Sequence, residues 1–197
     1  AWEGIKKQYF WQEEVDDFFK NIKIPDPNNA SNDRFAALPK EVRKGFNRTR
    51  WFWRYDTKQR YQEIIKGYYR MISGIDIELG KIREILSKKG IADNTIIIWM
   101  GDNGYFFGER QIAGKWLMYD NSVRVPLIIY DPRAKKHYDV DDMVANVDLA
   151  TTILDFAGIK SDLKTHGMSL VPYVYNGISK DKREELMIEH LWDFLPI

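Results

Sequence analysis

The sequence contains no cysteine, and this absence excludes several kinds of chemistry. Disulfide bonds, thiolate metal sites and cysteine nucleophiles cannot form within the 197 residues, and the redox compartment stays open. The sequence also lacks any apolar run that approaches the roughly 20 residues needed to cross a bilayer. We therefore expect no membrane span.

The sequence has almost no excess of one charge, because 30 Lys and Arg face 29 Asp and Glu, for a formal charge of +1. Nucleic-acid-binding domains usually carry a basic surface, so we expect no nucleic-acid partner. The first residues, Ala1-Trp2-Glu3-Gly4, lack the basic start and apolar centre of a secretory signal. The length and the 44% hydrophobic content suit one globular domain, or at most two small ones.

The longest regular pattern predicts a helix that is capped by Asp56 or Thr57 and runs to about Lys89. Its apolar residues recur at steps of three and four, which places them on a single face. Cations at Lys88-Lys89 followed by Gly90 are typical of a helix C-terminus. The apolar positions are Tyr61, Ile64, Ile65, Tyr68, Ile72, Ile75, Leu79, Ile82 and Leu86.

Shorter elements are predicted on both sides of this helix. A short helix is expected over 9–21, a loop over 21–29, and helical turns with surface loops over 36–56. Strands are expected at 95–100, at about 125–130 and at 186–189, and a helix at 148–156, capped by Asp148 and ended by Gly158. This order of helices and strands indicates an α/β fold.

The strand predicted at 95–100 is followed by a turn that carries two oxygen-bearing side chains. The strand does not alternate between apolar and polar residues, so we expect it to lie inside a sheet covered on both faces. Ligands gather at the carboxyl ends of such strands, where Asp102 and Asn103 stand. Carboxylate and amide oxygens suit Ca²⁺ or Mg²⁺. Asp-Asn-Gly is also a common turn that binds nothing, so the spacing alone leaves both readings open.

Three further residues are candidates for contact with a substrate. Lys115, in Gly114-Lys115, would neutralise charge on a metal-bound oxyanion, although a lone Gly-Lys is also typical of a solvated loop. Arg110 follows Glu109, and these two side chains either contact substrate or pair with each other or with solvent. His190 follows the strand predicted at 186–189, so it is also a candidate.

The remaining histidines and one aromatic-basic run have simpler interpretations. We expect His137 to be solvated in a polar loop and His166 to be a turn residue. The run over 48–54 could stack on sugars, but we favour packing on the body of the domain with its arginine tips in water.

A series of short motifs follows the order found in one enzyme family. The block resembles the sulfatase family, the type I sulfuric ester hydrolases of the alkaline-phosphatase-like superfamily. The resemblance is clear over about 60–175, whereas residues 1–56 are expected to be a loop-rich flank. The motifs are Asp93-Asn94-Thr95, Asp102-Asn103-Gly104, Gly108-Glu109, Gly114-Lys115, Ser122-Val123-Arg124-Val125-Pro126-Leu127-Ile128, Asn146-Val147-Asp148 and Gly167-Met168-Ser169-Leu170.

The resemblance implies a fold, an activity and roles for particular residues. The fold is an alkaline-phosphatase-like three-layer sandwich with a mixed, mostly parallel sheet covered by helices, of which this chain is the later part. The activity is hydrolysis of sulfate esters with a formylglycine nucleophile and a divalent metal, Ca²⁺ or Mg²⁺. Asp102 and Asn103 would be metal ligands and Lys115 the catalytic, sulfate-binding lysine. The partner would be a sulfated small molecule or glycan, and export to the periplasm, the extracellular space or the lysosome is favoured by the resemblance alone.

The sequence also departs from the family pattern. The Cys/Ser-x-Pro-x-Arg motif that yields formylglycine, the early Asp-Asp ligands and a His-containing loop are absent, so we expect them upstream of Ala1 and expect this chain alone to be inactive. Arg110-Gln111 stand where many members carry His, and a fixed cation there suggests an anionic substrate.

Three alternatives stay open at this point. One is a phosphodiesterase or phosphonate monoester hydrolase of the same superfamily. Another is a non-catalytic module that binds sulfated glycans, and the last is an α/β domain whose Asp-Asn-Gly is only a turn.

Overall fold

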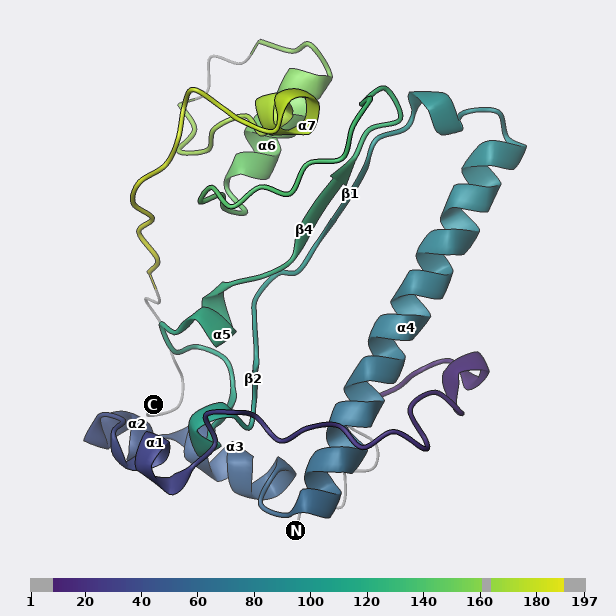
Figure 1. The fold of residues 1–197 in the computed structure, drawn as a ribbon. Helices are drawn as coiled ribbons and strands as arrows, with labels where there is room; N and C mark the ends of the chain where they lie inside the picture. The colour runs from purple at the N-terminus through teal and green to yellow at the C-terminus, as the bar shows by residue number, and fades with distance from the viewer. Residues whose placement is uncertain (1–8, 161–163, 190–197) are drawn as a thin grey trace. The chain divides into compact units, whose positions relative to one another are not determined.

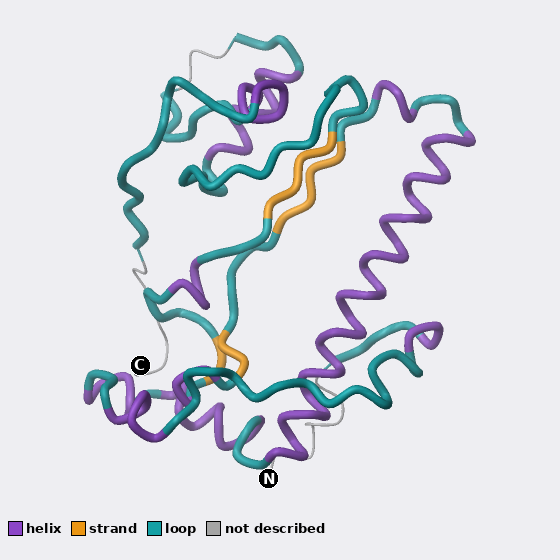
Figure 2. The backbone as a smooth tube through the Cα atoms, viewed as in Figure 1, coloured by secondary structure: helices purple, strands orange, loops and turns teal. Residues whose placement is uncertain are grey.

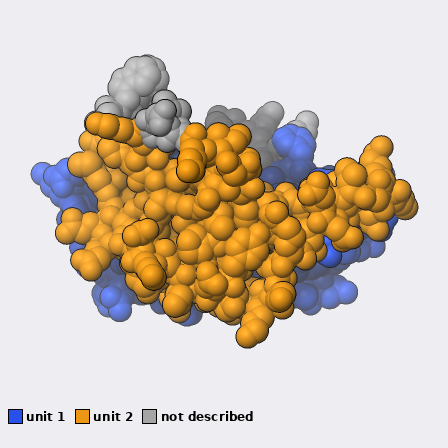
Figure 3. All heavy atoms as spheres, turned by 90° about the horizontal axis from the view of Figure 1, so that it is seen from above, with its two compact units in different colours: residues 1–85, 103–124, 190–197 blue, residues 86–102, 125–189 orange. Residues whose placement is uncertain are grey.

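The computed structural model describes residues 9–160 and 164–189, which form two compact units. The described part of the first unit comprises 9–85 and 103–124, and the second unit comprises 86–102 and 125–189 (Figure 3). One boundary between the units falls between Asp102 and Asn103.

Helix α4 (Lys58–Lys88) is the longest element and confirms the helix predicted from the apolar period (Figure 1). The N–H of Arg60 donates to the hydroxyl of Thr57 at 3.2 Å, so Thr57 caps the helix. Gly90, with a left-handed φ of 67°, follows its C-terminus. No helix in the described part of the chain, α4 included, is long and apolar enough to cross a membrane.

The first unit is built around the N-terminal half of α4 and two small apolar cores. One core contains Tyr61, Ile64 and Ile65 of α4 together with Ala113, and the other contains Phe106 and neighbouring apolar residues. Residues 106–117 are therefore anchored in the interior. The shorter elements are η2 (Glu13–Val15), α1 (Asn32–Ala36), α2 (Lys40–Lys44), α3 (Phe46–Arg54), β2 (Phe106–Phe107), η4 (Glu109–Gln111), β3 (Ala113–Gly114) and α5 (Asp120–Val123).

Two predictions for the first unit need correction. The helix expected over 9–21 shrinks to the single turn η2, because Phe19 has a left-handed φ of 62° and the Trp11 indole donates to the Asp16 carboxylate. Residues 36–56 contain more regular helix than expected, since α2 and the nine-residue α3 occupy most of the segment.

The aromatic-basic run over 48–54 packs on the protein, as favoured, but the tips of Arg48 and Arg54 do not lie in water as expected. It forms the body of α3, where the guanidinium carbon of Arg48 lies 4.2 Å from the ring centroids of Phe35 and Trp51. Arg54 is buried as well. Through these contacts, the Arg48 cation packs against aromatic rings of the same unit.

The second unit contains the two strands that were predicted on either side of the Asp-Asn turn. Strand β1 (Ile97–Met100) pairs antiparallel with β4 (Leu127–Tyr130), in a register that places Met100 opposite Leu127 (Figure 2). Strands β2 and β3 of the first unit also pair antiparallel. Parallel pairing is therefore not seen among the described residues, and β1 is half-buried rather than covered on both faces.

The prediction of a strand at 186–189 is wrong. Those residues join no ladder, and the nearest pairing is an isolated antiparallel bridge between Met143 and Arg183. A strand needs a neighbour to satisfy its N–H and C=O groups, and the apolar residues Leu186, Met187 and Ile188 are exposed instead of buried. Apolar composition alone misled the prediction. The unit is completed by η3 (Ala92–Asn94), α6 (Asp148–Phe156) and α7 (Val171–Asn176).

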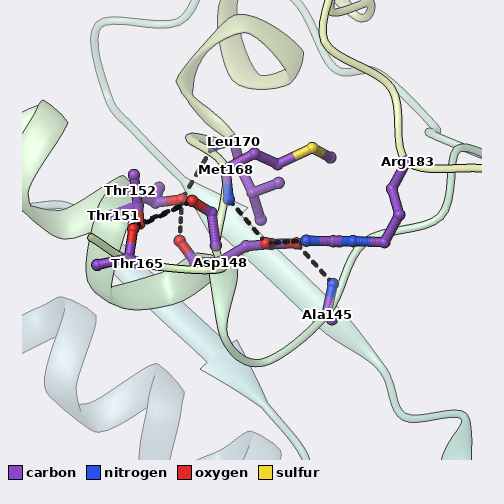
Figure 4. A network of polar contacts seen from close by, with 9 residues as sticks. Ala145, Asp148, Thr151, Thr152, Thr165, Met168, Leu170 and Arg183 are labelled. Atoms are coloured by element: carbon purple, nitrogen blue, oxygen red, sulfur yellow. Dashed lines mark hydrogen bonds and ion pairs between the residues drawn. The ribbon is translucent and has the colours of Figure 1, made fainter. Parts of the chain in front are cut away.

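Helix α6 matches its predicted bounds, but Asp148 has a different role from the expected cap. Val147 is the N-cap, and the fully buried Asp148 is the first helical residue. Its carboxylate accepts from the N–H groups of Ala145 at 2.7 Å and Met168 at 2.9 Å. Arg183 binds it with two nitrogens at 2.6 and 2.8 Å (Figure 4).

A second buried group continues this network toward α7. The hydroxyl of Thr152 donates to the carbonyl of Asp148 at 2.7 Å and accepts from the N–H of Leu170 at 2.9 Å. Asp148 and Thr152 thus join α6 to the preceding loop, to residues 168–170 and to Arg183 (Figure 4). Gly158, with a φ of 68°, ends α6 as predicted.

The Asp148 pair should dominate the stability of the second unit. Burial by itself would raise the pKa of Asp148, but its bonds from Arg183, Met168 and Ala145 outweigh burial and lower that pKa. Replacing Asp148 with Asn leaves Arg183 without its buried counter-charge, so the free energy of unfolding should fall by about 3–5 kcal/mol. Urea denaturation at pH 7 measures this change.

The sign of the pH dependence follows from the lowered pKa. Asp148 stabilises the folded state above its unfolded-state pKa, and that contribution is lost as the pH falls through the lower folded-state pKa. The exposed Asp142–Lys182 pair, 3.0 Å apart, provides the matched control, because Asp142→Asn should change stability little. Equal losses in the two variants would contradict a special role for Asp148.

Candidate functional site

The turn after β1 is held by backbone hydrogen bonds on both sides. The N–H of Gly101 donates to the carbonyl of Pro126 at 3.2 Å, and the N–H of Gly104 donates to the carbonyl of Ser122 at 2.8 Å. A Cβ atom on Gly104 would lie 2.2 Å from the carbonyl oxygen of Asn121, so only glycine fits there. Glycine at position 104 thus permits the close approach of the segment that follows β1 to the backbone of Asn121.

Asn103 and Lys115, two of the residues singled out from the sequence, meet in the structure. The ammonium of Lys115 donates to Oδ1 of Asn103 at 2.8 Å, and Nδ2 of Asn103 donates to the carbonyl of Gly104 at 2.9 Å. Asp102 is exposed, and its backbone carbonyl accepts from Nδ2 of Asn146 at 3.4 Å. The Gly-Lys motif is therefore not a freely solvated loop, since its cation lies on an amide oxygen of the turn.

The backbone around Lys115 is unusual. Gly114 has a φ of 100° and Trp116 a φ of 78°, so Lys115 lies between two left-handed residues. Nδ2 of the buried Asn47 donates to the carbonyl of Lys115 at 3.0 Å. The guanidinium carbon of Arg50 lies 4.0 Å from the ring centroid of Trp116. Helix α3 therefore contacts the loop on both sides of the lysine.

A second left-handed pair precedes this loop, at Arg110 and Gln111, with φ values of 53° and 56°. Gln111 is clamped from several directions. Its carbonyl and Oε1 accept from Arg48 at 2.9 and 3.0 Å, and its Nε2 donates to the carbonyl of Ala30 at 3.0 Å and to Oδ1 of Asn32 at 2.8 Å. These bonds offset the cost of the strained backbone.

Arg110 and Glu109 do not pair with each other in the described part of the chain. The N–H of Arg110 donates to the carbonyl of Asn29, and its guanidinium carbon lies 5.3 Å from the ring centroid of Tyr119. Its buried Nε has no acceptor among the described residues. The Glu109 carboxylate accepts from the N–H of Phe107 at 2.5 Å, and burial raises the pKa of Glu109.

The histidines contribute little to the described site. His190 lies outside the described residues. His137 is exposed, as predicted, and lies 3.0 Å from the carboxylate of Asp139. His166, expected as a turn residue, lies at a bend and is exposed. No group of three or more His, Cys, Asp or Glu that could hold a metal occurs in residues 9–160 and 164–189.

The donor set at the turn is nonetheless of the right chemistry for a hard cation. Asp102 and Asn103 offer a carboxylate and an amide oxygen, which suit Ca²⁺ or Mg²⁺. Two donors are only part of the six to eight oxygens that Ca²⁺ takes. The residues present therefore fit one side of a metal site.

Sequence reasoning missed the residues that hold the site loops, namely Asn47, Arg48 and Gln111. Asn47 and Arg48 lie more than 60 positions before their partners, and no local pattern marks such contacts. The nearest available signal was the aromatic-basic run itself, which was correctly interpreted as packed but not as a support for the site.

The fold of the chain is similar to the folds of several solved structures. The solved structure of BT4656 in complex with its substrate D-glucosamine-2-N,6-O-disulfate matches with a TM-score of 0.67 and 24% identity, over 90% of this chain and 47% of that one. At that identity the likeness shows the fold alone, which is the alkaline-phosphatase-like α/β fold expected from the sequence. A phosphonate monoester hydrolase from Silicibacter pomeroyi matches with a TM-score of 0.61 and 30% identity, over 64% of this chain and 25% of that one.

Sequence comparison defines the family within this fold. The Sulfatase family model matches residues 16–159, and the chain belongs to the sulfatase family. The N-acetylglucosamine-6-O-sulfatase of Bacteroides thetaiotaomicron is 37% identical over 118 residues, which are 59% of this chain and 21% of that protein. The chain thus spans about a fifth of the length of this curated relative.

The left-handed backbone at Arg110 yields a stability prediction. Arg110→Gly relieves the left-handed strain whereas Arg110→Ala keeps it, so the Gly variant should be more stable than the Ala variant by about 1 kcal/mol. Chemical denaturation of the two variants measures the difference. At Arg83, inside α4, the order should reverse, because Gly is the poorer helix former. The same order at both positions would mean that residue 110 is not strained.

Proposed function

We propose that this chain supplies part of the active site of a sulfatase that hydrolyses sulfate esters of a carbohydrate. The observation that carries the proposal is the contact between Lys115 and Asn103, the expected sulfate-binding lysine and an expected metal ligand. Membership of the sulfatase family supports the reaction class.

Each residue of the proposed site has a physical role. The ammonium of Lys115 is a compact cation that neutralises charge on the sulfate oxygens, both in the bound ester and as the S–O bond breaks. Its bond to Asn103 fixes the direction in which the ammonium points. Arg110 offers a second cation, and a guanidinium is suited to another anionic group of the substrate.

The metal and the nucleophile are further parts of this proposal. Asp102 and Asn103 would hold one side of a Ca²⁺ or Mg²⁺ ion, which would supply Lewis-acid stabilisation of the sulfate oxygens. A formylglycine from another segment of the protein would supply the nucleophile. The 197 residues alone would not hydrolyse the ester, because they contain no Cys/Ser-x-Pro-x-Arg motif that could yield formylglycine. Residues 9–160 and 164–189 also hold no complete metal shell.

The proposed substrate class is a sulfated sugar. The curated relative is named for N-acetylglucosamine-6-O-sulfate chemistry, and the fold neighbour BT4656 binds a glucosamine that carries two sulfates. A substrate with a second anionic group also gives Arg110 a partner.

A second candidate function rests on a specific likeness. The phosphonate monoester hydrolase from Silicibacter pomeroyi is 30% identical over 64% of this chain, and a tetrahedral phosphonate also suits a metal and a lysine. The two functions are distinguished by the kcat/KM of the complete protein on a sulfated glucosamine and on a phosphonate monoester. A higher kcat/KM on the phosphonate would overturn the sulfatase proposal.

Replacing Lys115 tests the proposed catalytic role. In the complete protein, Lys115→Ala should lower kcat/KM for the sulfate ester by about 100-fold or more, because a positioned cation is lost from the developing charge. Steady-state kinetics measures the change. Lys136→Ala, an exposed lysine on a loop of the second unit, is the matched control and should retain full activity. Full activity in Lys115→Ala would remove the lysine from the mechanism.

Calcium titration tests the metal ligands without relying on turnover. Ca²⁺ should raise the melting temperature of the complete protein, because a ligand that binds only the folded state stabilises it. Asp102→Ala should remove most of this increase, whereas Asp93→Ala, an exposed carboxylate before β1, should keep it. An unchanged increase in Asp102→Ala would show that the Asp-Asn-Gly segment is only a turn.

A further inference from the structure

We propose that Asn47 is a positioning residue, which holds the ammonium of Lys115 in place through the backbone carbonyl of that lysine. This inference rests on the proposed function of Lys115 and goes beyond it, because it assigns a role to a helix that contributes no side chain to the reaction itself. Its basis is the part-buried hydrogen bond from α3 to the loop, 68 positions away.

The donor of this bond is a buried side chain. Asn47 is only 4% exposed, and its Nδ2 lies 3.0 Å from the carbonyl oxygen of Lys115. If the donor were removed, that carbonyl would lose its hydrogen-bond partner in the protein. The bond therefore restricts where the Lys115 backbone can lie.

The loop needs such a restraint because its conformation is locally unfavourable. Trp116 is a bulky residue with a φ of 78°, a region that side chains other than glycine rarely adopt. Gly114, with a φ of 100°, turns the chain just before the lysine. Without tertiary contacts the loop would relax, since left-handed residues cost about 1–3 kcal/mol each.

Arg50 provides a second contact from the same helix. Its guanidinium stacks over Trp116, and a Cβ atom on Gly114 would lie 3.1 Å from its Nη1. Glycine at position 114 thus lets α3 approach the loop closely. The Gly-Lys motif gains a physical meaning, because glycine permits the approach of α3 that brings Asn47 to the lysine carbonyl.

The consequence concerns the direction of the Lys115 side chain. With the backbone in its present position, the ammonium lies 2.8 Å from Oδ1 of Asn103. A shift of about 1 Å in a positioned catalytic group can cost 100-fold in rate. Asn47 should therefore affect turnover without touching the substrate.

The test is a double-mutant cycle in the complete protein, with kcat/KM for the sulfate ester as the readout. Asn47→Leu keeps the size of the side chain but removes the donor, and it should lower kcat/KM by about 10- to 100-fold. In the Lys115→Ala background the same change should have almost no further effect, because the group that it positions is gone. Asn47→Gln, which retains the donor, should recover part of the activity.

A matched control separates positioning from loss of stability. Thr152→Val removes a buried hydroxyl that bonds Asp148 and Leu170 in the second unit, so it should destabilise the protein. Its effect on kcat/KM should be small and should be the same in the wild-type and the Lys115→Ala backgrounds. If Asn47→Leu, like Thr152→Val, changes kcat/KM by the same factor in both backgrounds, the inference is overturned.

Two other results have distinct meanings. If Lys115→Ala retains full activity while Asn47→Leu is impaired, the proposed function of Lys115 fails and the inference fails with it. If Lys115→Ala is impaired but Asn47→Leu is fully active, only the inference fails. If Asn47→Leu does not fold, Asn47→Gln takes its place in the cycle. An equal loss of kcat/KM in the wild-type and Lys115→Ala backgrounds would again contradict a positioning role.

Discussion

The site of the first unit depends on one constraint, which is a run of left-handed backbone that its own residues do not favour. Arg110, Gln111 and Trp116 all have positive φ values, although none of them is glycine. This backbone persists because side chains of α3 hold it, chiefly the half-buried Arg48 on Gln111 and the buried Asn47 on Lys115. Strain that is held by tertiary contacts is typical of functional loops, where it fixes side chains in place before a ligand arrives.

The second unit solves a similar problem by a different means. Its loops carry little regular structure, and a buried ion pair with four charge-assisted bonds on Asp148 ties them to α6. Asn146, two residues before Asp148, donates to the carbonyl of Asp102. The same loop therefore joins the interior of the unit to the turn that carries a proposed metal ligand. In both units, polar groups that are buried and satisfied define where the functional residues lie.

The predictions succeeded where the cause is local and failed where it is remote. The spacing of apolar residues and the residues at the helix ends were enough to predict α4 and α6. A helix forms its backbone hydrogen bonds within one segment, so a local pattern can reveal it. The segment 186–189 failed because a strand requires a neighbour that no local pattern reveals. The prediction that Asp148 caps α6 was wrong for a similar reason, because its partner Arg183 lies 35 positions later in the sequence.

The sequence by itself determined the family, the α/β fold class, the long helix and the placement of Asp102 and Asn103 directly after β1. Those features follow from composition, period and the order of motifs, all of which are written along the chain. Only the tertiary structure decided that Lys115 bonds Asn103, that Arg110 is left-handed, and that α3 supports the loop. These facts depend on contacts between residues far apart in the sequence, and such contacts exist only once the chain has folded.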